Sequence, residues 1–338
     1  MTTTVAPPRA DTRRPTAPDT GVRGWRQRHG FQAAVLIPAL SLVGIFVYGF
    51  IAYSAQVSLS DWQGLTPDLT LKQPVGSTYA ELFATPRFQA DLRNIFVFTA
   101  LFLALAVITG VVLALLVHNA LAARGFFRSV FLFPYALSFI VTGVVWRWIF
   151  TPSAGANLIL DWLGIEAQPK WITDPTVVGD VSGALSAVIP GEAIAVELGI
   201  PMALIPVVIA AAWQLGGFAM ANFLAALAAM PEELKEAATL DGANTWQYHR
   251  YVVLPTLRPM IAVVLILLTH VSLKSFDLVY AMVGQGPGFA TDVPGIFVFE
   301  QTFRALKYNT GAAASIVMLI LVAVVMVPYL YRSTRGRS

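Results

Sequence analysis

Long uncharged runs of apolar residues, separated by more polar segments, form the main pattern of this chain. A helix needs about 20 apolar residues to cross roughly 30 Å of hydrocarbon, because every backbone amide must be bonded within the helix there. We therefore predict an all-α, polytopic membrane protein with six transmembrane helices. The predicted spans are residues 31–53, 94–117, 129–150, 200–226, 257–283 and 311–331.

One further apolar stretch, from Val181 to Pro201, has nearly the composition of a seventh span. We place it outside the bilayer, in a long outer loop of residues 151–199, because polar and helix-breaking residues interrupt it. These residues are Pro190, Gly191, Glu192 and Glu197. The part from residue 177 to 199 either touches a solute-binding protein or is an insertion without a function of its own, and the sequence leaves both open.

The distribution of basic residues supports six spans, because cytoplasmic segments of membrane proteins are enriched in Lys and Arg. With both termini cytoplasmic, fourteen of the 22 basic residues lie inside, six lie outside, and Arg147 and Lys274 lie within spans. A seventh span would put the termini on opposite sides. The inner set is Arg9, Arg13, Arg14, Arg23, Arg26, Arg28, Arg124, Arg128, Lys235, Arg250, Arg258, Arg332, Arg335 and Arg337. The outer set is Lys72, Arg87, Arg93, Lys170, Arg304 and Lys307.

Composition and motif content narrow the function further. Hydrophobic residues make up 57% of the chain and charged residues 12%, against about 45–50% and about 25% in soluble domains. Residues 1–30, rich in Pro, Thr and charge, are expected to form a disordered basic cytoplasmic tail before a membrane domain of residues 31–332. Without cysteine, a phosphate-binding loop, an H-E-x-x-H pair or a nucleophile elbow, the chain is expected to have no catalytic or metal-binding residues. Its net charge of +3 is explained by topology and does not indicate nucleic-acid binding.

The polar segment 231–255, between the fourth and fifth spans, predicts two short helices joined by a turn. Pro231 suits a first helical turn, and Gly242 suits the left-handed position that ends a helix. Asn244 and Gln247 resemble a capping box at the start of the second helix, which we expect Leu254 and Pro255 to stop. Leu234 and Leu240 would supply apolar contact in a helix that docks in a groove of another protein.

The same segment resembles the EAA loop of binding-protein-dependent ABC importer permeases. Its Glu-Ala-Ala triplet, its glycine and its Leu-Pro pair are spaced as in that loop, with Val252 in place of the usual isoleucine. The resemblance implies a coupling helix that sits in a cleft of a cytoplasmic ATPase subunit. Its expected coupling residues are Glu236, Ala237, Ala238, Asp241, Gly242, Leu254 and Pro255.

Other segments resemble the carbohydrate permeases of the maltose, trehalose and glycerol-3-phosphate group. Ser275 to Tyr280, the run Gly284 to Gly288 and Thr291 are similar to a signature of that group, although Gln285 interrupts its usual glycine run. After the third span, the similar residues are Gly155, Asn157, Leu158, Trp171, Asp174 and Pro175. The likeness extends over roughly residues 31–332 and implies a type I ABC importer permease fold.

This resemblance implies a set of partners and a location. The chain would pair with a second homologous permease subunit, two copies of a cytoplasmic ATPase subunit and an extracytoplasmic solute-binding protein. The ATPase subunits would use ATP and Mg²⁺, and this chain would bind no cofactor itself. It would lie, surrounded by lipid, in a bacterial cytoplasmic membrane and form half of the path for a sugar or a sugar-like solute.

Two ionisable residues within the fifth predicted span need a reason, because charged side chains in a bilayer are costly. Lys274 and Asp277 are three positions apart, so they either line a solute path or form an ion pair that joins helices. Sugars are bound by polar and aromatic side chains, and the other candidates for the path are of these kinds. They are Trp213, Gln214, Asn222, Ser272, Ser275 and Tyr280, with Asn94, Tyr135, Ser138 and His270 as weaker ones. Each of them is also suited to helix packing.

Three alternatives stay open at this point. An ABC importer permease for a non-sugar solute would share the loop and the spans. A secondary transporter would show internal repeats and an ion site on broken helices, and no repeat is visible in the sequence. A membrane enzyme would place a catalytic constellation at one membrane face, and the sequence shows none.

Overall fold

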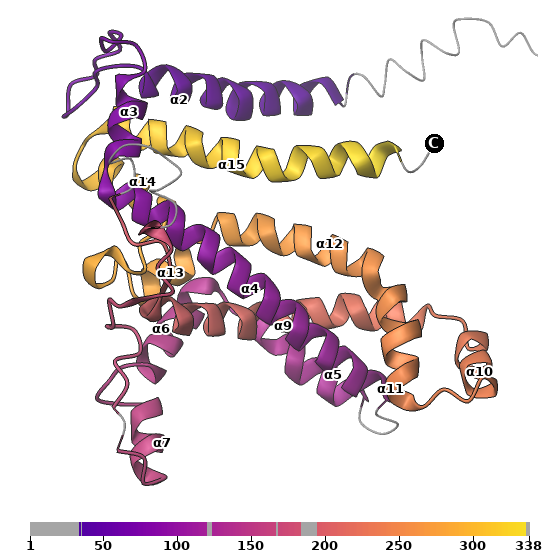
Figure 1. Cartoon of the computed structure of the whole chain (residues 1–338). Helices are drawn as coiled ribbons and strands as arrows, with labels where there is room; N and C mark the ends of the chain where they lie inside the picture. Colours follow the sequence, from indigo (N-terminus) through magenta and orange to yellow (C-terminus); the bar gives the residue numbers. More distant parts are fainter. Residues whose placement is uncertain (1–33, 35, 120–123, 167, 184–194, 336–338) are drawn as a thin grey trace, which may run out of the picture. The chain divides into compact units, whose positions relative to one another are not determined.

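Helices account for nearly all regular structure in the computed structural model, which describes residues 34, 36–119, 124–166, 168–183 and 195–335 (Figure 1). The described residues contain two short strands, β1 (Val177–Val178) and β2 (Ile200–Pro201), which pair antiparallel. The tail expected at residues 1–30 and part of the apolar stretch 181–201 lie outside the described residues. The all-α fold class is confirmed.

The chain divides into two units, residues 1–53 and 54–338. In the first unit, the helix that begins at Leu36 passes through a π-helical segment, η1 (Gly44–Gly49), into α2 (Phe50–Ser58). This helix, Leu36–Ser58, is uncharged and long enough to cross a membrane.

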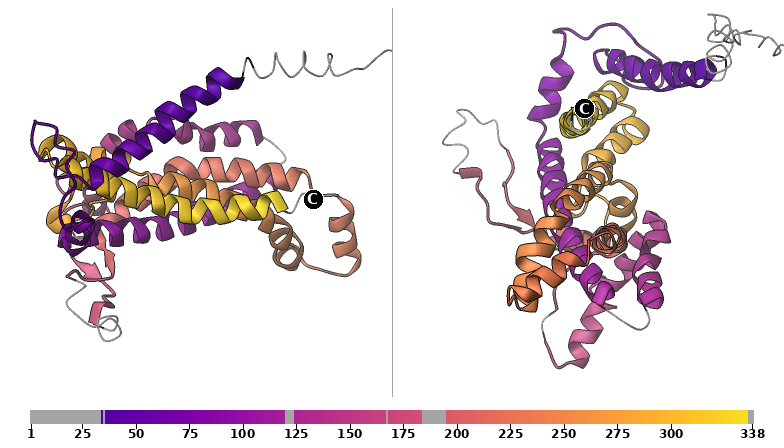
Figure 2. Two further views of the ribbon diagram at one scale, coloured as in Figure 1. Left: turned by 90° about the horizontal axis from the view of Figure 1, so that it is seen from above. Right: turned by 90° about the vertical axis from the view of Figure 1, so that its right-hand side faces the viewer.

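Four long helices build the second unit, and they lie side by side in Figures 1 and 2. They are α4 (Pro86–Asn119), α9 (Ile205–Ala228), α12 (Leu254–Leu273) and α15 (Tyr308–Arg335). Of the described helices, five are long and apolar enough to cross a membrane, and a bent pair makes six if it counts as one span.

Shorter helices lie at the two ends of this unit (Figure 1). The α10 end carries α10 (Glu233–Leu240) and α11 (Thr245–Tyr248). The opposite end, called the α14 end below, carries α3 (Ser77–Ala84), α7 (Ala156–Trp162), α13 (Asp277–Met282) and α14 (Pro294–Phe299). The 3-10 turn η5 (Pro287–Phe289) and the π-helical turn η6 (Glu300–Arg304) flank α14. Another 3-10 turn, η3 (Met202–Leu204), leads into α9.

The core is the contact between α4 and α9, which is made by small residues. Ala106 and Ala114 of α4 and Ala219 of α9 are fully buried. A Cβ atom added at Gly110 of α4 would lie 2.6 Å from the Cβ of Ala219. Small side chains let helix backbones approach closely, which is how many membrane helices associate without a hydrophobic driving force between them.

The third predicted span, residues 129–150, is not one straight helix. Helix α5 (Arg124–Leu132) and the 3-10 turn η2 (Phe133–Ala136) meet α6 (Phe139–Ile149) at an angle of 98°. Pro134 lies in the turn, and Ser138 caps α6 by accepting a hydrogen bond from the Val141 amide at 3.2 Å. A proline that cannot donate and a new N-cap explain why the helix ends and restarts here.

The fifth predicted span, residues 257–283, is also broken, and this prediction of one helix is wrong. Helix α12 ends at Leu273, and α13 begins at Asp277. Because neither proline nor glycine lies between them, no local signal marks this break. Instead, α13 packs on α6, where a Cβ atom at Gly143 would lie 2.9 Å from the Leu278 carbonyl oxygen and 2.8 Å from the Ala281 Cβ. Tertiary packing, rather than helix propensity, turns the chain.

The predicted stop at Leu254 and Pro255 is wrong as well. Helix α11 passes through the π-helical segment η4 (His249–Val253) directly into α12, so the helix runs from Thr245 to Leu273. Pro255 lies two residues after η4, and the wider π turn accommodates its ring and its missing N–H within the continuous helix. The Thr256 hydroxyl donates to the Val252 carbonyl at 2.7 Å.

Candidate functional site

The loop at the α10 end folds by local capping, largely as its sequence predicts. Gly242 adopts the left-handed conformation, with φ of 75°, directly after α10. The amide of Ala243 then donates to the Ala238 carbonyl at 2.9 Å, which closes the end of that helix. The predicted capping box is confirmed, because Asn244 and Gln247 each accept a hydrogen bond from the other's backbone amide, at 2.9 and 2.8 Å.

Apolar side chains are displayed on this loop rather than buried. Leu240 is 88% exposed, Trp246 67% and Tyr251 69%. Such a group of exposed large side chains on an ordered element is typical of a docking surface.

Most of the predicted coupling residues are exposed on the loop, and two lie where the loop joins α12. Glu236, Ala237, Asp241 and Gly242 are exposed, and Ala238 is half-buried. Within the part of the chain that the structure describes, Glu236 has no ion-pair partner, so its carboxylate is available to another protein. Leu254 and Pro255 are half-buried at the start of α12, where they join the loop to that long helix.

The break between α12 and α13 contains four of the predicted path residues. Lys274 and Asp277 are both exposed and no ion pair joins them, so of the two alternatives for these residues the ion pair is not found. Lys274 is the C-cap residue that follows α12, and Asp277 is the first residue of α13. Ser272 is buried, and its hydroxyl lies 3.0 Å from that of Thr99, so this contact joins α12 to α4. The backbone amide of Ser275 donates to the Ser272 carbonyl at 3.0 Å.

Tyr280 of α13 is held from two sides. Its hydroxyl accepts a hydrogen bond from the Arg304 guanidinium at 2.9 Å. Its ring stacks on Phe276 at 5.1 Å between centroids and meets Phe299 edge-on at 5.5 Å. Tyr280 therefore has a fixed orientation, and only a part of its surface remains available to a solute.

The three candidates on α9 have different surroundings. Trp213 is 41% exposed and meets Trp146 of α6 edge-on at 5.6 Å. Gln214 is buried, and its amide donates at 2.8 Å to the carbonyl of Leu137, which lies at the bend before α6. Asn222 donates to the Phe218 carbonyl of its own helix at 2.8 Å. The structure thus supports a packing role for Gln214 and leaves Trp213 as the accessible aromatic surface.

The weaker candidates mostly have structural partners. Asn94 is fully buried and donates to two carbonyls of the α14 end. Ser138 caps α6, and the exposed Tyr135 stacks on Phe218 at 5.3 Å. His270 is half-buried, and its Nδ1 has no partner among the described residues.

An aromatic row that sequence reasoning did not assemble extends from Trp213 toward the α14 end. Trp146 stacks on Phe150 at 5.4 Å, and Phe150 meets Trp171 at 5.3 Å. The indole N–H of Trp171 donates to the side chain of Asn157 at 2.6 Å. Asn157 and Trp171 were visible as similar to carbohydrate permeases, but only the fold shows that they contact each other.

Two aspartates of the loops at this end are fixed as hydrogen-bond acceptors. Backbone and hydroxyl hydrogen bonds from Thr176 lower the pKa of Asp174, and those from Ser182 lower the pKa of Asp180. Asp180 also accepts from the Leu198 amide at 2.8 Å, which closes the base of the loop beside β1 and β2.

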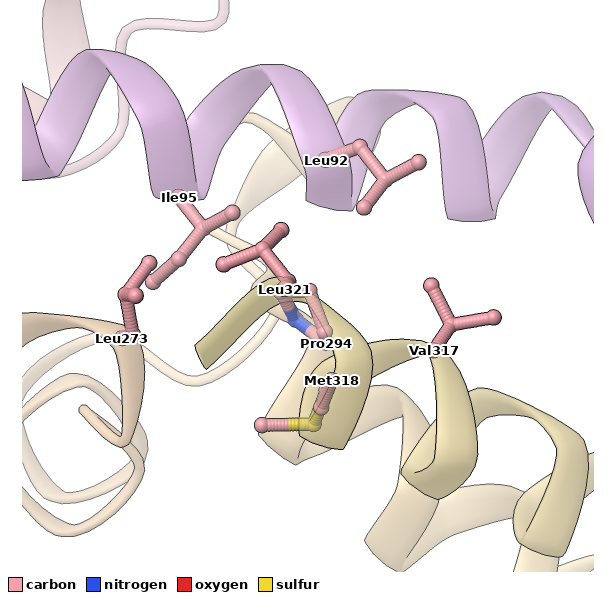
Figure 3. Close-up of a pocket in the computed structure, with 7 residues that line it drawn as sticks. All are labelled: Leu92, Ile95, Leu273, Pro294, Val317, Met318 and Leu321. Atoms are coloured by element: carbon pink, nitrogen blue, oxygen red, sulfur yellow. The ribbon is translucent and has the colours of Figure 1, made fainter. Parts of the chain in front are cut away.

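A small cavity lies between α4, α12, α14 and α15 (Figure 3). The side chains around it are apolar: Leu92, Ile95, Leu273, Pro294, Val317, Met318 and Leu321. Since it offers no hydrogen-bonding side chain, this cavity is unsuited to a polar solute such as a sugar.

Comparison with known proteins identifies the family. Residues 106–335 match the family model described as the binding-protein-dependent transport system inner membrane component. The chain belongs to this family. It is therefore a multi-pass membrane permease component of an ABC importer and not an enzyme in itself, as the sequence predicted.

Curated relatives support this assignment over nearly the whole chain. A probable ABC transporter permease protein of Pyrococcus horikoshii is 34% identical over 307 residues, which cover 90% of this chain and 95% of the relative. The xylose/arabinose import permease protein of Haloferax volcanii is 30% identical, covering 86% of this chain and 84% of the relative. The trehalose/maltose transport system permease protein of Thermococcus litoralis is 29% identical, covering 88% and 91%.

Solved structures show the same fold. A chain of a bacterial ABC transporter involved in the import of the acidic polysaccharide alginate superposes with a TM-score of 0.72 at 20% identity, covering 93% of this chain and 99% of that chain. A chain of the same kind of transporter, in complex with an alginate pentasaccharide-bound periplasmic protein, gives a TM-score of 0.73 at 20% identity, covering 93% and 97%.

Proposed function

We propose that this chain is the permease subunit of an ATP-driven sugar importer and that it receives the closure of the ATPase through the α10 loop, residues 231–255. The observation that carries the coupling role is the ordered, exposed surface of this loop. A helix fixed by the Gly242 turn and the Asn244 cap displays Glu236 and Leu240 to solvent. Such a surface fits a groove on a partner protein.

The continuity of the helix after this loop supports a mechanical role. Residues 245–273 form one helix through η4, so a displacement of the docked loop moves α12 as well. The far end of α12 is the break at Lys274, where the exposed candidates for the solute path lie. The loop and the path are thus joined by a continuous element, as coupling requires.

A sugar as solute is supported by the relatives and by the chemistry of the path. The relatives named above include permeases for xylose and arabinose and for trehalose and maltose. Trp213 offers an accessible aromatic face, and Asp277 and Lys274 offer exposed hydrogen-bonding groups. Aromatic faces pack on the C–H surface of a sugar, while charged and polar groups bond to its hydroxyls.

The assembly follows from the same proposal. This chain forms half of the path, and a second homologous permease forms the other half. Two copies of an ATPase subunit, which use ATP and Mg²⁺, dock at the α10 end, and an extracytoplasmic solute-binding protein docks at the α14 end. The α10 end and both termini then face the cytoplasm.

The experiment that tests this function is purification of the tagged chain from its native membrane in mild detergent, followed by mass spectrometry. We expect recovery of an ATPase subunit, a second permease and a solute-binding protein in fixed ratios. The purified binding protein then identifies the solute. A binding protein specific for amino acids or ions would show that the transported solute is not a sugar.

Matched variants test the docking surface in the same purification. Leu240→Ser removes an exposed side chain of the α10 loop, and we expect it to lower ATPase recovery severalfold. Leu65→Ser is the control, because Leu65 is 82% exposed at the α14 end. Equal ATPase recovery with both variants would contradict the docking role of the α10 loop.

A further inference from the structure

A pair of buried carboxyl groups lies at the α14 end. Asp91 in the first turns of α4 and Asp292, just before α14, are both fully buried, and the two carboxyl groups interact with each other. The two residues are 201 positions apart in the sequence and meet only in the fold.

The two carboxyl groups have unequal surroundings. Asp292 accepts a hydrogen bond from Arg87 Nε at 2.7 Å and another from the Val293 amide at 3.1 Å. For Asp91, no N–H or O–H group of the described residues reaches either oxygen. The Asp292 carboxyl that interacts with Asp91 is itself an acceptor when ionised, so it offers Asp91 no donor.

The nearby cations are already matched by other anions. Arg87 is paired with Asp292 and lies under the rings of Phe289 and Phe297, at 5.1 and 5.3 Å from their centroids. Glu300 lies farther from Arg87, with 3.9 Å between Arg87 Nη1 and Glu300 Oε2. It forms its shorter ion pair with Arg304, at 2.9 Å.

The remaining nearby cation is Arg93, and it is directed elsewhere. Its guanidinium donates to the Asn94 side chain at 2.9 and 3.0 Å and to the Glu197 carbonyl at 2.8 Å. Arg87 Nη2 is buried without a hydrogen-bond partner, yet among the described residues neither Arg87 nor Arg93 donates a hydrogen bond to Asp91.

We propose that Asp91 is a neutral carboxylic acid that donates its proton to Asp292, and that this proton fixes the segment 284–294 on α4. An unpaired buried carboxylate beside a second one is too costly to persist, so one of the two must hold a proton. Burial raises the pKa of Asp292, but the hydrogen bond from Arg87 opposes this shift and keeps Asp292 as the ionised member.

The proton acts together with Asn94 on one segment. Asn94 donates to the carbonyls of Phe289 and Asp292, at 2.8 Å each, so α4 grips this segment at the backbone as well as at the Asp292 side chain. The segment carries the glycine run 284–288, in which Thr291 donates to the Gly284 carbonyl at 3.1 Å. Asp91 is thus a positioning residue for a part of the chain that follows α13.

Infrared spectroscopy of the purified full-length chain in detergent, together with its co-purified subunits, tests the protonation directly. We expect the carbonyl stretch of a protonated carboxyl group at neutral pH, shifted in heavy water and absent from Asp91→Asn. Asp68→Asn is the control, since exposed Asp68 is held ionised by hydrogen bonds from Thr70, which lower its pKa. Loss of the same band in Asp68→Asn, or no such band in the wild type, would overturn the proposal.

Thermal unfolding provides a second readout. The folded chain keeps the proton of Asp91 at pH values at which the unfolded chain has already released it. Raising the pH therefore destabilises the wild type through Asp91. Asp91→Asn keeps a donor to Asp292 and removes this pH dependence. The melting temperature of Asp91→Asn minus that of the wild type should therefore increase as the pH rises. Asp91→Ala leaves Asp292 without the donor and should melt below Asp91→Asn at every pH. An Asp91→Asn variant as unstable as Asp91→Ala would show that Asp91 is not a donor.

Discussion

The side-chain amide of Gln214 donates to the carbonyl oxygen of Leu137 at 2.8 Å, and Leu137 lies at the bend between η2 and α6. This bond fills an acceptor that the interrupted helix leaves open. We predict that Gln214→Leu destabilises the chain by about 0.5–1.5 kcal/mol, because the part-buried Leu137 carbonyl loses its donor while loss of the unpartnered Gln214 Oε1 offsets part of the cost. A thermal melt of the purified protein measures the effect.

Asn222→Leu is the matched control for this prediction. It also removes an amide from α9, but Asn222 bonds only to the Phe218 carbonyl of its own helix. Its melting temperature should therefore change less. If Gln214→Leu melts like the wild type but alters solute preference, Gln214 belongs to the solute path and not to the packing of α6.

The contact between α5 and α9 depends on Gly217. A Cβ atom at this position would collide with the carbonyl oxygen of Phe131. Gly217→Ala should cost about 1–3 kcal/mol, because backbone atoms must shift to make room. At Gly125 of α5 an added Cβ meets no atom within 4 Å, so Gly125→Ala should stabilise its helix by about 0.5–1 kcal/mol. Opposite shifts in melting temperature are expected, and equal shifts would contradict the close α5–α9 contact.

The turn at Gly242 provides a prediction about transport. Proline holds φ near about −65°, whereas Gly242 has φ of 75°, so Gly242→Pro must reorient α10. We expect solute uptake by membrane vesicles to be lost while the chain is still inserted, and Glu236→Lys to give the same result. Gly64→Pro is the control, because Gly64 has φ of 85° and, like Gly242, donates one backbone hydrogen bond, but it lies at the α14 end. Normal uptake with Gly242→Pro and Glu236→Lys would refute coupling through this loop.

The exposed carboxylate of Asp277 allows a test of the solute path. If it bonds to solute hydroxyls, Asp277→Ala should raise the half-saturating solute concentration for uptake about 10- to 150-fold, since a hydrogen bond to a charged group contributes about 1.5–3 kcal/mol. Asp61→Ala removes an equally exposed carboxylate away from the α12–α13 break and should leave that concentration unchanged. An unchanged value for Asp277→Ala would assign Asp277 to the start of α13 alone.

The sequence predicted those features that depend on nearby residues. Hydropathy predicted the membrane helices, and the Gly242 turn and the Asn244–Gln247 cap followed from positions within a few residues of each other. The bend at Leu137 was missed although Pro134 and the Ser138 cap are local signals for it. The break at Lys274 was missed because it depends on the contact of α13 with α6. The same holds for the Arg87–Asp292 ion pair, whose partners are 205 positions apart.

The close approach of α4 and α9 at Gly110 limits which helices can move in a transport cycle. Two backbones that meet without a large side chain between them have no alternative rotamers to use for sliding, so these helices form a fixed frame. Between α12 and α15 lie longer side chains, among them Leu273 and Leu321, which line the small cavity and can repack. Opening and closing of the path is then expected as a shear of α12 and α15 over a stationary α4–α9 pair.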